Sequence, residues 1–148
     1  MGRMESLKRS CLDTDFIIDY LRKPSKPVKS IMESFERGRI QVYTTSMNTF
    51  EVWLGVCLAP KPEELAGETD ELLSQLEIAN FGYDASIEAS RIMAELRRGG
   101  RAIEIRDLFI GTIAKINETP LITRNVKHYE RIPELTILTP EEVANKLK

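Results

Sequence analysis

The chain has 148 residues, 42% of them hydrophobic and 30% charged, and carries a net charge of −2. This balance is typical of a folded globular protein and excludes a disordered one, and the length predicts one domain that spans residues 1–148. The acidic sequence pI of about 5.6 argues against a protein that binds nucleic acid through positive charge alone, but it does not exclude a nuclease whose carboxylates hold divalent metal.

Cysteine and histidine are too few to build a zinc site. Cys11 and Cys57 both have apolar neighbours, and we expect both to be small buried residues. A single histidine, His128, cannot form a histidine-based metal site. The first ten residues have no apolar core of signal-peptide length, and no apolar run approaches a membrane span, so we expect a cytoplasmic protein with no membrane contact.

The first half of the chain alternates between strand and helix patterns. Apolar spacing and breaker residues predict, in order, a strand at 7–13, helices at 15–23 and 26–39, a strand at 40–46 and a helix at 48–59. Gly38 is the expected C-terminal cap of the second helix. A polar helix at 62–76, interrupted at Gly67, and a short strand at 76–82 follow.

The second half continues the alternation. We expect a helix at 84–100 with Asp84 as its cap, a helix at 106–118, a strand at 119–123, a short helix or turn at 126–133 and a strand at 135–138. The C-terminal helix at 139–148 has Thr139 as its N-cap and Pro140 in its first turn. Strands that alternate with helices of this length predict an α/β fold with a mostly parallel sheet.

Four polar side chains fall where such a sheet places functional sites. Asp13 follows the first strand, Glu51 lies near the start of the helix after the second strand, Asp107 opens its helix, and Asn125 follows the strand at 119–123. Because sites in parallel α/β sheets form at the carboxyl ends of the strands, we expect these four residues to share one edge of the sheet.

The residues alone allow two explanations for this acidic edge. A carboxylate in the first turn of a helix gains about 0.3–1 kcal/mol from the helix dipole, which explains any one of these acids without a function. Several carboxylates at a partly buried edge repel one another unless a cation neutralises them, and oxygen ligands suit Mg²⁺ or Mn²⁺. Metal-dependent phosphodiester chemistry and an unrelated binding role therefore both remain open.

Three segments carry a resemblance to a known family. "CLDTDFIIDYLR" is similar to the opening strand and Asp-Thr-Asp turn of the PIN-domain proteins, specifically the VapC-type toxins of toxin–antitoxin pairs. "TTSMNTFEVWLGV" resembles their strand end followed by a helical Glu. "GGRAIEIRDLFIGTIAKINETPLITRNVKHYERIPELTI" resembles their closing module, with its third acid and a Leu-Ile-Thr-Arg-Asn run.

The resemblance implies a PIN-like fold and a metal-dependent endoribonuclease that hydrolyses RNA phosphodiester bonds. It implies that Asp13, Glu51 and Asp107 are catalytic acids that bind Mg²⁺ or Mn²⁺. Asn125 stands where many members have a fourth acid, and as an assisting catalytic residue it leaves the number of metal ions open. The implied partners are an RNA substrate, a cognate antitoxin and a second copy of the chain in a homodimer, with the region around 59–76 a place for partner binding.

Neighbouring residues have less certain roles in this scheme. Asn48 stands where the family pattern has Thr, and Thr45 or Ser46 can supply a hydroxyl instead. We expect Asp15 to cap the first helix rather than to support the metal site. For Arg106 and Arg124 an exposed, solvated arginine is the default, and contact with RNA phosphate is the alternative.

Two other functions compete with the nuclease. One is a catalytically weak or inactive PIN-like domain that binds RNA or protein, an alternative motivated by Asn125 and the acidic pI. The other is a small-molecule phosphatase in which Asp13 would be the nucleophile, since Asp13 and Asp15 follow a strand two residues apart. The chain has no clear lysine and threonine motif to accompany that chemistry.

Overall fold

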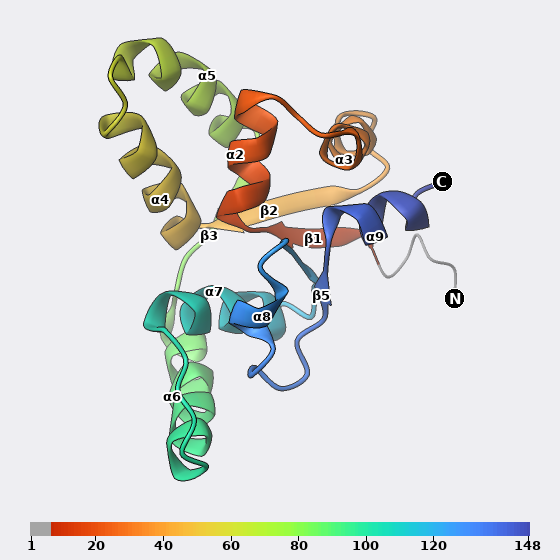
Figure 1. Ribbon diagram of the computed structural model, residues 1–148. Helices are drawn as coiled ribbons and strands as arrows, with labels where there is room; N and C mark the ends of the chain where they lie inside the picture. The colour runs from red at the N-terminus through yellow and green to blue at the C-terminus, as the bar shows by residue number, and fades with distance from the viewer. Residues whose placement is uncertain (1–6) are drawn as a thin grey trace.

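A five-stranded parallel sheet forms the centre of the protein (Figure 1). The computed structural model describes residues 7–148; residues 1–6, part of the segment in which we expected no signal peptide, lie outside the described residues. The sheet order is β3-β2-β1-β4-β5, and every neighbouring pair is parallel. The strands are β1 (Arg9–Leu12), β2 (Gln41–Thr45), β3 (Glu77–Ala79), β4 (Leu121–Ile122) and β5 (Ile137–Leu138).

Helices connect the strands and cover both faces of the sheet. They are α2 (Thr14–Arg22), α3 (Lys26–Glu36), α4 (Ser46–Cys57), α5 (Pro62–Ser74), α6 (Tyr83–Arg98), α7 (Ile105–Ile116), α8 (Val126–Tyr129) and α9 (Pro140–Lys146). Figure 1 shows α2, α3, α4 and α5 on one side of the sheet and α6, α7 and α8 on the other. The expected α/β fold with a parallel sheet is therefore confirmed.

Successive side chains of the strands point to opposite faces of the sheet and contribute to two separate hydrophobic cores. On β1, Leu12 packs into the core under α2, α3 and α9, whereas Cys11 packs into the core against α6 and α7. The same alternation puts Ile122 of β4 on the first side and Leu121 on the second. Because both faces are covered, the strands are short apolar runs, as parallel sheets require.

The order of the strands creates a switch point between β1 and β4. The chain moves outward from β1 to β2 and β3 on one side, and then returns to place β4 on the opposite side of β1. Their register pairs Leu12 with Ile122, so the residues that follow both strands emerge next to each other. Crevices at such switch points are where parallel α/β sheets bind ligands.

The helix ends agree in part with the sequence. Gly38 follows α3 with a φ of 72°, a backbone conformation that favours glycine, and Thr139 and Glu142 form the capping box of α9. The expected interruption at Gly67 is wrong, because α5 runs through it. Asp84 does not cap α6, since Gly82 is the N-cap and Asp84 lies in the first turn.

The two cysteines differ in environment. Cys11 is buried in the central strand, as expected, and burial raises the pKa of its thiol. Cys57 is exposed at the end of α4, so the expectation that it is buried is wrong. Among residues 7–148, no helix has the length and apolar content needed to cross a membrane.

Candidate active site

Asp13 is the most buried acid of the site. It directly follows β1 and is the N-cap of α2, and its side chain has no exposed surface. Both carboxylate oxygens accept hydrogen bonds of 2.8 to 3.2 Å, and the donors are the backbone N–H of Thr14 and the side chains of Asn48, Arg106, Thr123 and Tyr129. Burying a carboxylate costs free energy unless it is hydrogen-bonded in this way, and these bonds fix the orientation of the Asp13 side chain.

Asn48 connects the acid to the helix that follows β2. Its amide nitrogen donates to Asp13 Oδ1 and to the hydroxyl of Thr14, both at 2.9 Å. Its amide oxygen accepts from the hydroxyl of Thr45, which caps α4. Asn48 therefore positions Asp13 with the same side chain that completes the cap of α4. Within residues 7–148, the hydroxyls of Thr45 and Ser46 bond Asn48 and Met47 and do not reach the acids.

Glu51 and Asp107 complete the acidic group from two other helices. Glu51 lies in α4 and accepts a hydrogen bond of 2.5 Å from the Thr14 hydroxyl. Asp107 lies in the first turn of α7, is 6% exposed, and has His128 Nδ1 3.8 Å from its Oδ2. Asp13, Glu51 and Asp107 thus come together at the carboxyl end of the sheet, as predicted.

The guanidinium of Arg106 lies between these three carboxylates. It donates from Nε and Nη2 to the two oxygens of Glu51 at 2.5 and 2.8 Å, from Nη1 to Asp107 at 2.6 Å, and from Nη2 to Asp13 at 3.2 Å. A further bond of 2.9 Å links Nη1 to the Tyr129 hydroxyl. Arg106 is therefore not the solvated surface residue expected from the sequence, because the acids of three elements converge on it.

The titration of the surrounding groups reflects this network. Burial raises the pKa of Glu51, but hydrogen bonds from Arg106 and Thr14 outweigh it and bring the pKa below its ordinary value. Burial and the neighbouring charge of Asp13 raise the pKa of Tyr129, which keeps this phenol protonated as a donor. Glu51 is therefore held ionised and Tyr129 neutral at physiological pH.

Asn125 does not join the acids. It is exposed, and in residues 7–148 its side chain makes no hydrogen bond to Asp13, Glu51 or Asp107; only its backbone N–H bonds the hydroxyl of Thr123. Asn125 lies two residues beyond Thr123, which does bond Asp13. The structure therefore places Asn125 at the rim of the site rather than within it.

Asp15 and Arg124 hold the loop after β4. Asp15 is not the cap of α2, a role that Asp13 fills; it accepts a 2.8 Å hydrogen bond from the backbone N–H of Arg124. Burial raises the pKa of Asp15. The Arg124 side chain is ion-paired with Asp19 and Glu141 rather than simply solvated, so it fastens the loop to α2 and α9.

Several residues of the site were missed by sequence reasoning. They are Thr14, Thr123 and Tyr129. Asn48 was noted only as a departure from the family pattern, and Arg106 only as a solvated residue or an RNA contact. Thr14 and Thr123 were detectable, since each adjoins or follows a strand that ends at the predicted rim. Tyr129 gave no signal, because it contacts Asp13 across 116 positions of sequence.

The donor set fits a divalent cation only after a rearrangement. Carboxylate oxygens from three elements lie within hydrogen-bonding distance of one cationic group, and Mg²⁺ and Mn²⁺ prefer such ligands. Within residues 7–148, however, no three acidic, histidine or cysteine side chains surround a common ion position. The acids meet around Arg106, whose guanidinium bonds the oxygens that a metal would use.

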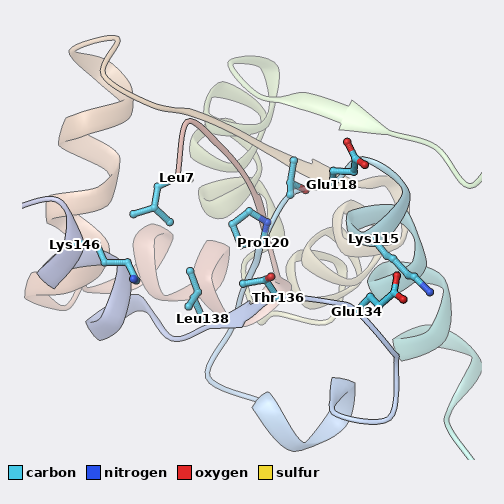
Figure 2. Close-up of a pocket in the computed structure, with 9 residues that line it drawn as sticks. Leu7, Lys115, Glu118, Pro120, Glu134, Thr136, Leu138 and Lys146 are labelled. Atoms are coloured by element: carbon cyan, nitrogen blue, oxygen red, sulfur yellow. The ribbon is translucent and has the colours of Figure 1, made fainter. Parts of the chain in front are cut away.

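A separate pocket lies at the opposite end of the sheet (Figure 2). Leu7, Pro120 and Thr136, which precede or lead into β1, β4 and β5, line it together with Lys115 and Glu118 at the end of α7, Leu138 of β5 and Lys146 of α9. The pocket therefore opens at the amino ends of the strands, away from the acids. It contributes no residue to the acidic group.

Comparison with known proteins agrees with this architecture. The family model of the PIN domain matches residues 10–135. The chain is 27% identical to ribonuclease VapC2 of Rickettsia felis over 85% of its own length and 93% of that protein. It is 30% identical to ribonuclease VapC1 of Methanocaldococcus jannaschii, over 83% of its own length and 80% of that protein.

A solved structure extends the similarity to three dimensions. The VapBC2 complex of Rickettsia felis, bound to a DNA fragment from its promoter, contains a chain that superposes with a TM-score of 0.79 and 25% identity. The match covers 88% of this chain and 98% of that one. The chain belongs to the PIN-domain family, and its relatives are VapC ribonucleases.

The network around Asn48 yields a stability prediction. Asn48→Ala removes one donor from buried Asp13 and leaves the cap of α4 incomplete. Because unpaired buried polar groups cost about 1–3 kcal/mol, we expect the free energy of unfolding, measured by urea titration, to fall by about that amount. The exposed Asn145 of α9 provides the control, and Asn145→Ala should change the free energy by less than about 0.5 kcal/mol. Equal stability of the two variants would contradict this role of Asn48.

Proposed function

We propose that this chain is a Mg²⁺- or Mn²⁺-dependent endoribonuclease and the toxin of a VapBC-type pair, acting as one PIN-like domain in the cytoplasm. One observation carries the proposal: Asp13, Glu51 and Asp107, from three separate elements, converge at the carboxyl end of a parallel sheet. These are the same three acids that the family resemblance implies, which supports the same conclusion.

The three acids have different tasks in the proposed reaction. Asp13 is the fixed ligand, because its buried carboxylate is oriented by hydrogen bonds on both oxygens. Glu51, which is held ionised, and Asp107 supply the remaining charge from the partly open side. The three carboxylates would hold a divalent ion, and the chemistry that it would supply is activation of a water and stabilisation of negative charge on the phosphoryl group. Asn125 and His128, both exposed at the rim, are in a position to orient the RNA backbone.

The burial of Asp13 argues against the phosphatase alternative. A carboxylate nucleophile must present an oxygen to the phosphoryl group of the substrate. Asp13 has no exposed surface, and hydrogen bonds engage both of its oxygens. This arrangement suits a rigid ligand better than an attacking group.

The prediction for catalysis concerns Asp107, which accepts fewer hydrogen bonds than Asp13 or Glu51. Asp107→Asn removes one negative charge and keeps the shape of the side chain, so we expect the variant to remain folded and to lose both Mn²⁺ binding and RNA cleavage. Asp70→Asn, a matched change at an exposed position of α5, should keep both. Calorimetric titration of the metal-stripped proteins and cleavage of total RNA measure the two properties. Cleavage by Asp107→Asn, or by wild type after removal of all divalent ions, would contradict the proposal.

The antitoxin of the proposed pair has a suitable surface on this chain. A groove between α2, α4 and α5 is lined mainly by apolar side chains, among them Ile18, Leu21, Val56, Leu58 and Leu65. Leu58 is 77% exposed, and an exposed apolar strip of this kind suits an amphipathic helix of a partner. We infer that the antitoxin binds in this groove.

We also infer that the chain forms a homodimer. Light scattering of the purified protein should therefore give the mass of two chains.

The groove generates its own prediction. Leu58→Asp places a charge in the apolar strip but far along α4 from Glu51, so we expect RNA cleavage and growth arrest to persist while the antitoxin encoded beside the gene no longer relieves the arrest. Ile116→Asp is the control, since Ile116 is 42% exposed on α7 and does not line the groove. Growth rescue of the Leu58→Asp strain to the level of the Ile116→Asp strain would place the antitoxin elsewhere.

A further inference from the structure

Arg106 has every one of its donors engaged in the acidic site. An arginine side chain offers five N–H groups, and those of Arg106 are distributed over Glu51, Asp107, Asp13 and the Tyr129 hydroxyl. Two parallel bonds to Glu51 make a bidentate pair, the strongest arrangement that arginine forms with a carboxylate. The guanidinium therefore stands where the acids would otherwise repel one another.

The same bonds use the oxygens that a metal would need. Both oxygens of Glu51, Oδ1 of Asp107 and Oδ1 of Asp13 accept from Arg106. Oδ2 of Asp13 is engaged by Thr123 and Tyr129 instead. A divalent ion thus cannot be shared by the three acids while the guanidinium remains in place.

Arg106 also has a route out of the site. It is the second residue of α7, its side chain is 30% exposed, and the preceding residue, Ile105, is 57% exposed. The long side chain can therefore turn towards solvent without disturbing the buried part of α7. Asp107, one position further along, is fixed at the edge of the core and remains in the site.

From these observations we propose that Arg106 is an internal counter-ion that neutralises the site in the metal-free protein and competes directly with the divalent ion for Asp13, Glu51 and Asp107. This inference rests on the proposed metal dependence and adds to it: the metal affinity of this chain is set by how readily Arg106 leaves. The three acids can then lie close together in the metal-free protein, and metal binding replaces the Arg106 guanidinium with the divalent ion.

The direct test is calorimetric titration of Mn²⁺ into metal-stripped wild type, Arg106→Gln and Arg124→Gln at neutral pH. Gln cannot neutralise the acids, so Arg106→Gln should bind Mn²⁺ about tenfold more tightly or better, as expected when a competing charge in close contact is removed. Arg124 is the matched control because it pairs with two acids outside the site, Asp19 and Glu141. Its variant should bind Mn²⁺ as wild type does.

A second measurement on the wild-type protein does not depend on the folding of a variant. The Nε–H signal of Arg106 in the NMR spectrum should be protected from solvent exchange without metal and lose that protection at saturating Mg²⁺, whereas the Arg124 signal stays unchanged. Unaltered protection of Arg106, or equal or weaker Mn²⁺ binding by folded Arg106→Gln, would overturn the inference.

The outcomes separate this inference from the proposed function. Mn²⁺ binding and RNA cleavage by wild type, without any gain in affinity on removal of Arg106, would defeat only the role of Arg106. Absence of Mn²⁺ binding in both wild type and Arg106→Gln would defeat the role of Arg106 and the metal dependence together. Binding by Arg106→Gln at Mn²⁺ concentrations where wild type stays empty would support both.

Discussion

The structure depends on satisfying the carboxylate of Asp13, which is fully buried where the strand order switches between β1 and β4. Removing a carboxylate from water costs several kcal/mol, and hydrogen-bond donors from α2, α4, α8 and the residue that follows β4 offset this cost. Each of these elements is held in place by one of the two hydrophobic cores. Both hydrophobic cores therefore support the elements whose hydrogen bonds hold Asp13 in place at the edge of the sheet.

Arg106 donates hydrogen bonds to all three acids of the site at once. A lone buried carboxylate can be satisfied by neutral donors, but Glu51 and Asp107 add two further charges at short distance, and a cation is required to hold them together. In this structure the protein supplies that cation from its own chain. The site is thus complete as an ion-paired network.

The sequence predicted the location of the acids but not the contacts between them. Asp13 and Asp107 could be placed because strand ends and helix starts are visible as patterns, and in a parallel sheet those ends share one edge. Arg106 could not, because its bonds to Asp13 and Glu51 cross 93 and 55 positions of sequence and an arginine beside a helix start is usually solvated. Asn125 was placed at the right edge of the sheet, but the sequence did not show that its side chain would be exposed at the rim. Cys57 was misplaced because apolar neighbours on a helix alternate between buried and exposed faces.

We propose that Asp13, Glu51 and Asp107 jointly bind a divalent ion. Anomalous diffraction from crystals of the protein grown with saturating Mn²⁺ tests it most directly. We expect one strong peak within coordination distance of carboxylate oxygens from all three residues, with the Arg106 guanidinium moved away from them. A peak bound by other residues, or no peak at this edge of the sheet while Arg106 keeps its bonds, would contradict it.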